Sequence, residues 1–255
     1  MTENIDYEEY HEKNHRSNLS GFELARWNAL SHFIPKHIPN EKKLNILDYG
    51  AGTGLHLGLW EKIFPNSEIF LTDISETGRT KFLRENSNYL KKYKLIRNNR
   101  SEFDSEKFDI VISIEVMEHV SDLFSYLNDI LRLLKPGGHF IWTTPCGNLL
   151  SVEHIYSLIT NQIIKTEEGY RKWAWEDPTH LRRLKSFEIE KKLTLIGFND
   201  VKFRFRAHLF SFICTYCPPK HYFKSMRNMI MNLDYRLFRF FPNGASMIGL
   251  ANKPK

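Results

Sequence analysis

The chain has few cysteines and no long apolar run. Only three of its 255 residues are cysteine, which is typical of a reducing compartment and unlike a disulfide-bonded scaffold. No stretch of about 18 consecutive apolar residues occurs, so the sequence predicts no transmembrane helix. The first residues, Met-Thr-Glu-Asn-Ile-Asp, are acidic and lack the basic, apolar pattern of a secretory signal. We therefore expect a cytoplasmic protein.

Glycine is also scarce, and its placement is informative. The chain has 13 glycines, and Gly50, Gly52 and Gly54 alternate directly after an apolar run that ends at Asp48. Glycine permits positive φ angles and a close approach of the backbone to a ligand. An acid at the carboxyl end of a strand lies where open α/β sheets bind ligands. The dinucleotide fingerprint G-x-G-x-x-G would need glycine at position 55 or 57, and both are leucine.

Six further segments have the composition of strands in a doubly wound α/β sheet. Phe108–Ile114 is the clearest, because it is β-branched and apolar as a buried parallel strand should be. Asp73 lies near the end of Glu68–Ile74, 25 residues after Asp48, an interval that fits strand, helix, strand. The other expected strands are 94–97, 139–145, 201–206 and 244–251, and the expected helices are 20–34, 186–193 and one that opens at 115–120 and ends at the glycines 137 and 138.

These ordered blocks resemble the motif series of class I S-adenosylmethionine (SAM)-dependent methyltransferases, in the group of the ubiquinone-biosynthesis enzymes. The resemblance covers residues 44–145 and returns at Asp177-Pro-Thr-His-Leu181 and Leu195-Ile-Gly-Phe198. It implies a Rossmann-like, doubly wound, seven-stranded sheet whose last strand, 244–251, is antiparallel. It also implies SAM as cofactor, S-adenosylhomocysteine as product and no metal ion.

We expect a single methyltransferase domain over residues 1–255, because apolar residues make up 42% of the chain and suffice for one substantial core. Its expected parts are an N-terminal helical cap (1–43), the SAM-binding core (44–145), a substrate insertion or lid (146–179), and a C-terminal half (180–255) that carries strands six and seven.

The resemblance places the cofactor at the carboxyl edge of the sheet. Asp73 stands where the family uses an acid that accepts both ribose hydroxyls, and Asn98 and Asn99 stand where relatives often carry an adenine-contacting acid. Arg26 resembles an arginine that approaches the SAM carboxylate, although an exposed helical charge is an equal alternative. The candidate cofactor-binding residues are Asp48, Gly50, Ala51, Gly52, Gly54, Asp73, Ile74, Asn98, Asn99, Ser113, Ile114, Glu115, Arg26 and Tyr10.

The candidate catalytic residues are two histidines. Methyl transfer from a sulfonium is a direct displacement that requires alignment and exclusion of water. A hydroxyl acceptor benefits from a base, and His119 is the first candidate because histidine titrates near neutrality and related enzymes carry the same Glu-His pair. His180 is the second. A backbone-bonded histidine and a surface cluster are the structural alternatives.

Arginines and aromatic side chains supply the candidate substrate contacts. Arg182 and Arg183 follow His180 directly, and a guanidinium pairs bidentately with phosphate oxygens. Aromatic-rich loops at the carboxyl edge of a sheet are common sites of specificity. The other candidate substrate-binding residues are Trp175, Tyr170 and His11.

Charge is unevenly distributed along the chain. Residues 181–255 hold 15 Lys and Arg against 4 Asp and Glu, a net charge of +11, whereas residues 1–180 hold 21 against 26, a net charge of −5. This favours an anionic small-molecule acceptor, a membrane surface or nucleic acid, with a solvated lysine-rich surface as the equal alternative. The segment 223–241 mixes basic and apolar residues; packing on its own protein or on a second subunit is favoured over a membrane surface.

Absent motifs narrow the acceptor. No Asn/Asp-Pro-Pro-aromatic motif follows the strand 108–114, as it does in amino-directed DNA methyltransferases, and no separate RNA-binding module is present. The Cys-x-x-Cys at 214–217 is interpreted as coincidence rather than a zinc site. Outside the core, the sequence is similar to methyltransferases of bacterial surface-polysaccharide pathways. The sequence therefore predicts O-methylation of a sugar, a sugar nucleotide or a phosphoryl group, without a nucleic-acid partner. The alternatives are a lipid-quinone methyltransferase at the membrane surface and a non-catalytic protein that binds nucleic acid or SAM.

Overall fold

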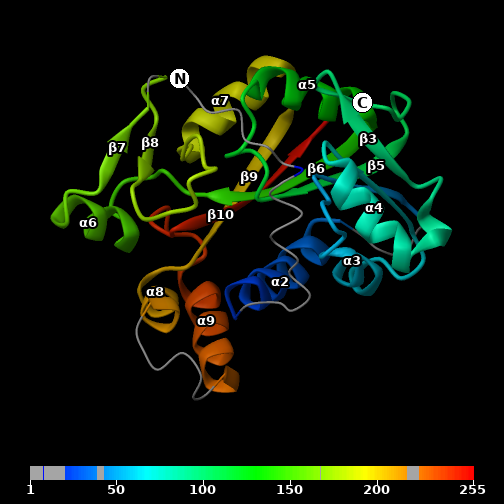
Figure 1. Cartoon of the computed structure of the whole chain (residues 1–255). Coiled ribbons are helices and arrows are strands. Elements are labelled where there is room, and N and C mark those ends of the chain that lie inside the picture. Colours follow the sequence, from blue (N-terminus) through cyan, green and yellow to red (C-terminus); the bar gives the residue numbers. More distant parts are fainter. Residues whose placement is uncertain (1–7, 9–20, 39–42, 167, 217–223) are drawn as a thin grey trace.

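The computed structural model describes residue 8 and residues 21–38, 43–166, 168–216 and 224–255. Its main sheet has eight strands, namely β1 (Asn45–Tyr49), β2 (Glu68–Asp73), β3 (Tyr93–Arg97), β4 (Arg100–Ser101), β5 (Phe108–Ile114), β6 (Leu134–Pro145), β9 (Asn199–Arg206) and β10 (Ser246–Asn252). Their order is β4-β3-β2-β1-β5-β6-β10-β9 (Figure 1). The last strand, β10, pairs antiparallel with both neighbours. The predicted seven strands are thus confirmed, and the two-residue β4 is an addition at one edge.

The parallel strands end together at one edge of the sheet. β1 pairs in parallel with β2 and β5, and β5 pairs in parallel with β6. Their carboxyl ends, at Tyr49, Asp73, Ile114 and Pro145, therefore lie side by side. Residues of β1 and β5 are buried almost without interruption, as expected for strands covered on both faces.

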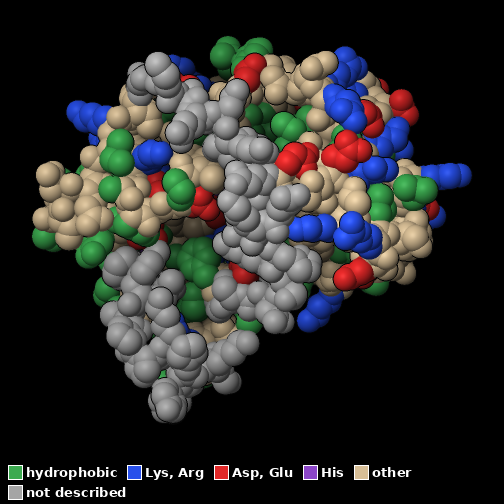
Figure 2. All heavy atoms as spheres, viewed as in Figure 1, with side chains coloured by type: hydrophobic (Ala, Val, Ile, Leu, Met, Phe, Trp, Pro, Cys, Tyr) green, Lys and Arg blue, Asp and Glu red, His purple; other side chains and the backbone are tan. Residues whose placement is uncertain are grey.

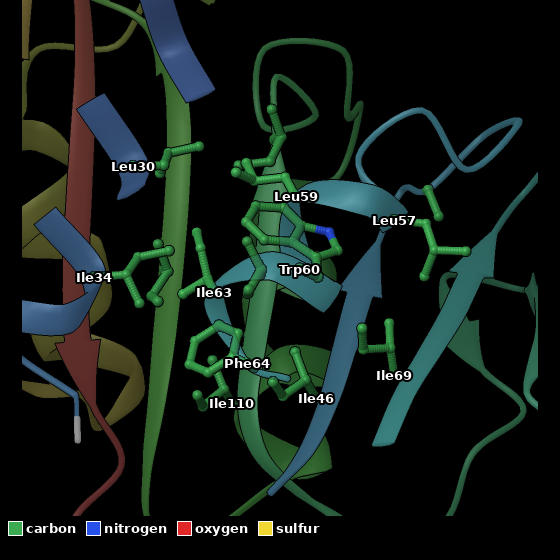
Figure 3. Packing of buried hydrophobic residues seen from close by; sticks show 14 of the residues in the cluster. Leu30, Ile34, Ile46, Leu57, Leu59, Trp60, Ile63, Phe64, Ile69 and Ile110 are labelled. Atoms are coloured by element: carbon green, nitrogen blue, oxygen red, sulfur yellow. The ribbon is translucent and has the colours of Figure 1, made fainter. Parts of the chain in front are cut away.

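One face of the sheet is covered by helices from the first third of the chain (Figure 1). These are α2 (Gly21–Phe33), the 3₁₀ turn η1 (Ile34–Lys36), α3 (Leu57–Ile63) and α4 (Glu76–Glu85), which the 3₁₀ turn η2 (Ser87–Tyr89) follows. Figure 3 shows Leu30 of α2 and Trp60 of α3 in one apolar cluster with Ile46 and Ile110 of the strands, and all four are fully buried. This packing fixes the loop between β1 and α3.

The opposite face is covered by α5 (Leu123–Leu133) and α7 (Ser186–Ile196). The expected helix start at residues 115–120 is wrong, because these residues form turns and α5 begins only at Leu123. Asp122 caps α5: its carboxylate accepts a hydrogen bond from the backbone N–H of Ser125 at 2.9 Å. The expected helix end at the glycines is also displaced, since α5 ends at Leu133 and the glycines 137 and 138 belong to β6.

Two segments extend beyond the layered core. The insertion contains α6 (Val152–Ile159) and a hairpin of β7 (Ile163–Lys165) and β8 (Arg171–Trp173). Between β9 and β10 lie α8 (Leu209–Tyr216) and α9 (Lys224–Phe238), and α9 contacts α2 (Figure 1). Among the described residues, no helix has both the length and the apolar character needed to cross a membrane.

Candidate active site

The glycine loop after β1 adopts a conformation that only glycine accepts readily. Gly50, Gly52 and Gly54 have φ angles of +83°, +53° and +75°, which lie in the left-handed region. A Cβ on Gly50 would stand 2.4 Å from a methyl group of Val116, and one on Gly54 would stand 2.4 Å from the ring of Phe82. Backbone angle and packing therefore both favour glycine at positions 50 and 54, and the backbone angle does so at position 52.

Asp73, at the end of β2, holds this loop against the neighbouring strand. Its Oδ2 accepts a hydrogen bond from the backbone N–H of Gly52 at 2.7 Å, and its Oδ1 accepts one from the N–H of Ser75 at 2.9 Å. A carboxylate oxygen has two lone pairs, so these bonds are compatible with further donors such as ribose hydroxyls. The side chain is largely buried, and Asp73 lines a cavity.

That cavity, of about 250 Å³, lies at the carboxyl edge of the parallel strands. Six of the predicted site residues contribute to its wall: Gly50, Asp73, Ile74, Asn99, Glu115 and His119. The residues that sequence reasoning missed are Tyr49, Ile96, Val116, Val120, Ser121, Tyr126 and Thr179. Tyr49 lies within the glycine motif and Thr179 within the Asp-Pro-Thr-His block, whereas nothing local marks Tyr126, which reaches the cavity from α5.

Several predicted cofactor residues lie behind the cavity rather than in its wall. Asp48 is fully buried and accepts a hydrogen bond from the indole N–H of Trp60 at 2.7 Å. Burial raises the pKa of Asp48 to about 7, against the opposing hydrogen bond from Trp60. Ser113 donates to the carbonyl of Tyr49 at 2.9 Å. These contacts support the loop from below. The predicted residues Ala51, Gly52, Gly54 and Ile114 do not line the cavity either.

Asn98 and Asn99 form the turn between β3 and β4. Both have positive φ angles, +51° and +58°, and they connect the paired residues Arg97 and Arg100. A two-residue hairpin with two positive φ angles is the type I′ arrangement, in which asparagine is favoured. The turn explains both asparagines structurally, and it brings Asn99 into the cavity wall.

Glu115 directly follows β5 and is held in a strained conformation. Its φ angle is +53°. Its carboxylate accepts a hydrogen bond from the hydroxyl of Thr143 at 2.8 Å and forms an ion pair with Arg26 of α2 at 2.9 Å. Burial alone would raise the pKa of Glu115, but Arg26 and Arg206 outweigh it and hold the pKa below its usual value. Arg26 is thus buried beside the cavity, where it contacts the wall residue Glu115 but does not line the wall itself.

His119 and His180 lie together, with ring centroids 4.8 Å apart. His119 lines the cavity, and its Nδ1 lies 3.2 Å from the carbonyl oxygen of Thr179. Burial, and then His180, lower the pKa of His119, so its imidazole is neutral at pH 7 and able to accept a proton. Burial opposes the charged form of His180 too, but Glu176, 3.1 Å from its Nδ1, and nearby carboxylates raise its pKa.

Glu118 lies beside these two histidines. It is fully buried, and the hydroxyl of Thr144 donates to its Oε2 at 3.0 Å. Burial, followed by the charge of Glu115, raises the pKa of Glu118 to about 8. One ligand atom each from Glu118, His119 and His180 lie within 4.8 Å of one another, and two imidazoles with a carboxylate are a donor set suited to zinc.

The two predicted phosphate-binding arginines make contacts within the protein. Arg183 is buried, and its guanidinium binds Glu176 at 2.6 Å and Glu153 at 2.7 Å. Arg182, also buried, donates to the carbonyl oxygens of Val120 at 2.8 Å and Ser121 at 3.3 Å. These donors are committed to holding the insertion and the 115–121 turns in place.

The predicted aromatic contacts lie farther out in the insertion. The Tyr170 ring lies 5.4 Å from the Arg182 guanidinium, and the Trp175 indole N–H donates to Ser157 at 2.8 Å. Neither residue lines the cavity. Tyr10 and His11 lie outside the described residues, as do Cys217 and His221 of the Cys-x-x-Cys region.

The structure also describes Glu8, which is not among the site residues predicted from the sequence. Its carboxylate accepts hydrogen bonds from the backbone N–H groups of Glu76 and Thr77, both at 2.8 Å, and from the hydroxyl of Ser75 at 3.0 Å. Burial would raise its pKa, but these hydrogen bonds at the start of α4 lower the pKa to about 2. Glu8 therefore lies beside Ser75, the residue that follows Ile74 of the cavity wall.

The chain is similar to known methyltransferases in sequence. A family model described as "Methyltransferase domain" matches residues 21–202. The chain is 23% identical over 210 residues to the ubiquinone biosynthesis O-methyltransferase of Proteus mirabilis, covering 71% of this chain and 80% of that protein.

Two solved structures share the architecture at low identity. One is a complex of the Haloferax volcanii Trm112 methyltransferase activator with a methyltransferase, matched with a TM-score of 0.62 and 19% identity over 92% of this chain and 93% of that one. The other is phosphoethanolamine N-methyltransferase 2 of Haemonchus contortus in complex with SAM, matched with a TM-score of 0.58 and 17% identity over 98% of this chain and 60% of that one. At these identities the matches concern the fold alone.

Proposed function

Because the chain belongs to the family of methyltransferase domains, we propose that this SAM-dependent methyltransferase methylates an oxygen of a small or carrier-linked acceptor. The proposed acceptors are sugars, sugar nucleotides or phosphoryl groups of bacterial surface polysaccharides. The observation that carries the proposal is that one cavity wall contains both Asp73, suited to a ribose, and the neutral His119, suited to deprotonating a hydroxyl.

The residues around the cavity fit SAM. The Gly50 backbone lies in the wall without a Cβ, and Ile74 and Ile96 offer apolar surface beside Asp73. In the proposed binding mode, Asp73 accepts the ribose hydroxyls, while Glu115 and Arg26 lie toward the amino-acid part. The bound cofactor supplies an electrophilic methyl group on a sulfonium.

The chain's contribution to the reaction is positioning and proton transfer. The 115–121 turns, held by Arg182 from behind, place His119 at the cavity. His119 accepts the acceptor's hydroxyl proton as the oxygen–methyl bond forms and the sulfur–methyl bond breaks, leaving S-adenosylhomocysteine and a methyl ether or ester. Burial on the core side keeps water from competing.

An anionic acceptor is supported by charges other than Arg182 and Arg183. Arg206 ends β9 at the carboxyl edge of the sheet and is buried, and its Nη1 has no hydrogen-bond partner among the described residues. Burial, followed by the charge of Arg26, lowers the pKa of Arg206 to about 9. Arg206 does not line the cavity, but its charge and that of Arg26 act together on Glu115 in the wall. Two buried guanidinium groups on one carboxylate leave a net positive charge there, which favours a negatively charged group on the acceptor.

A second candidate function is methylation of a lipid quinone or a related membrane metabolite. It is favoured by the similarity to the Proteus mirabilis ubiquinone biosynthesis O-methyltransferase over most of that protein's length. Membership of an enzyme family displaces the non-catalytic alternatives, a nucleic-acid-binding protein and a SAM-binding regulator.

The test combines calorimetry with an acceptor screen. Wild-type protein should bind SAM and S-adenosylhomocysteine, Asp73→Asn should weaken both, and the exposed Asp200→Asn should not. Release of S-adenosylhomocysteine would then be followed with sugar nucleotides and phosphorylated sugars, and in parallel with catechol-type quinone precursors. Turnover with the quinone precursors alone would replace the first candidate by the second, and failure to bind SAM would reject both.

A further inference from the structure

Exposed apolar side chains concentrate in two segments of the chain. Of the large hydrophobic residues that are exposed in the described part, seven lie between 149 and 164 and nine between 209 and 241. On α6, Leu158 is 61% exposed and Ile159 is 78% exposed. The complete set is Leu149, Leu150, Ile155, Tyr156, Leu158, Ile159 and Ile164, with Leu209, Phe210, Ile213, Met226, Met229, Leu233, Leu237, Phe240 and Phe241.

These two segments form one surface. Helix α6 contacts α8, and α8 packs on α9, so the described residues of 149–165 and 209–241 make a continuous region that we call the apolar lobe. Figure 1 shows α6 at the left of the sheet and α8 and α9 below it, on the side away from α4, and Figure 2 shows some hydrophobic side chains at the surface in the region of α6. Exposed apolar side chains gathered on neighbouring elements are typical of a protein or membrane contact.

The exposed charge of the lobe has one sign. Its sequence contains two acids, Glu153 and Asp234, and both are buried. Glu153 pairs with Arg183 at 2.7 Å, and Asp234 accepts the backbone N–H of Ser211 at 3.0 Å. The basic residues that remain at the surface are Lys165, Arg227, Arg236 and Arg239.

The charge of the apolar lobe distinguishes between a second copy of the chain and a membrane as its binding partner. A second copy of the chain that docked lobe to lobe would bring only cations into the contact, because the lobe has no exposed acid to neutralise them. A surface that combines exposed apolar and basic side chains instead matches an anionic phospholipid surface, into whose headgroup boundary it can insert. We propose that the apolar lobe docks this protein onto anionic membranes, with α6 inserted at the interface.

The lobe is connected to the active site by a chain of buried ion pairs. Glu153 of α6 binds Arg183, Arg183 binds Glu176, and Glu176 lies 3.1 Å from His180. The ring of His180 in turn packs on His119 of the cavity wall. Docking through α6 therefore holds the cavity close to the lipid headgroups. If the proposed O-methyl transfer is correct, this location favours a lipid-linked acceptor.

The test measures lipid binding without any acceptor, so it is independent of the proposed reaction. Wild-type protein is sedimented with phosphatidylcholine vesicles that contain or lack phosphatidylglycerol. We expect binding only to the anionic vesicles, weakened by added salt. The double variant Leu158→Glu/Ile159→Glu should lose at least tenfold in partitioning, and Lys165→Glu/Arg236→Glu should lose severalfold.

Matched control variants distinguish docking through the apolar lobe from a general effect of adding negative charge to the protein surface. Leu195 on α7 is 78% exposed, as is Ile159, so Leu195→Glu should leave vesicle binding unchanged, and Lys191→Glu should do the same for charge. Circular dichroism confirms that each variant is folded. The proposal is overturned if wild-type protein ignores anionic vesicles, if the α6 double variant binds like wild type, or if the double variant instead dissociates a dimer detected by light scattering.

Discussion

The two walls of the cavity are built by different means. On the glycine-loop side, residues 48–75 are fixed by positive φ angles and by backbone N–H groups bound to Asp73. On the insertion side, residues 176–183 are fixed by buried ion pairs that reach from Glu153 to His180. The first wall depends on short-range backbone geometry, and the second on side chains far apart in the sequence.

The difference between the two walls matches two requirements of a methyltransferase, namely binding of the cofactor and binding of the acceptor. In the proposed function the glycine-loop side binds SAM, whose shape does not change from one acceptor to another, so this wall can be a fixed backbone shape. The acceptor varies, and an ion-pair network allows residues on several elements to change together. We therefore expect substitutions in the two walls to have separable effects on SAM binding and on the stability of the insertion.

The largest effect is expected from Arg183→Ala. The change leaves Glu153 and Glu176 buried without their guanidinium partner, and breaking a buried ion pair by removing one member costs about 3–5 kcal/mol. Urea unfolding would measure the loss, with Lys191→Ala on the surface of α7 as a control expected to change stability by less than about 0.5 kcal/mol. If Arg183→Ala weakens SAM binding while unfolding is unchanged, the two walls are not separate.

The next largest effect is expected from His119→Ala. Loss of a general base lowers kcat by about 100-fold or more, while the dissociation constant for SAM should stay within about twofold. Because the pKa of His119 is lowered, the wild-type rate should be constant near neutrality and should fall only as the pH drops through a value below the usual 6.5. His139→Ala, at the far part of β6, is the matched control. An unaltered rate in His119→Ala would remove the base role.

Sequence reasoning was most accurate where structure is determined locally. The strand Phe108–Ile114 was predicted with its observed bounds, because a continuous β-branched run has few other buried conformations. The alternating glycines do form a loop after β1, and Asp73, Glu115 and His119 line one cavity, although their roles stay predictions.

The errors arose where contacts are distant. The start of α5 was misplaced because the turns of residues 115–121 are held by Arg182, 62 residues from Val120 in sequence. The adjacent pair Arg182 and Arg183 gave no sign that its partners would be carbonyls on one side and Glu153 and Glu176 on the other. Pairings of this kind depend on how the insertion folds back, which residue spacing does not encode.

A smaller effect is expected from Gly50→Ala. Forcing a Cβ into a φ of +83° costs about 1–3 kcal/mol, and the new atom meets Val116 at 2.4 Å. SAM affinity should fall about tenfold, since 1.4 kcal/mol corresponds to one decade. Gly58→Ala in α3 is the control, because nothing lies within 4 Å of its Cβ position. Adding Val116→Ala to Gly50→Ala should restore part of the affinity; an equal loss with Gly58→Ala would mean that glycine geometry is not the cause.

The last expected effect, that of Glu118→Gln, is on stability rather than on activity, and it vanishes at low pH. The folded-state pKa of Glu118 is raised to about 8 from an unfolded value of 4.5. The native state therefore binds one more proton than the unfolded state between these values, and wild-type stability declines as the pH rises from 4.5 to 8. Glutamine keeps an oxygen for Thr144 and cannot ionise, so the variant should be more stable than wild type near pH 8, by a few kcal/mol for a pKa raised this far, and equal to it near pH 4.5. Thermal unfolding across this range measures the difference. Lower stability of Glu118→Gln at pH 8 would show that the carboxylate itself is needed beside His119 and His180. Protein freed of metal with a chelator would then be titrated with zinc to measure whether these three residues bind it.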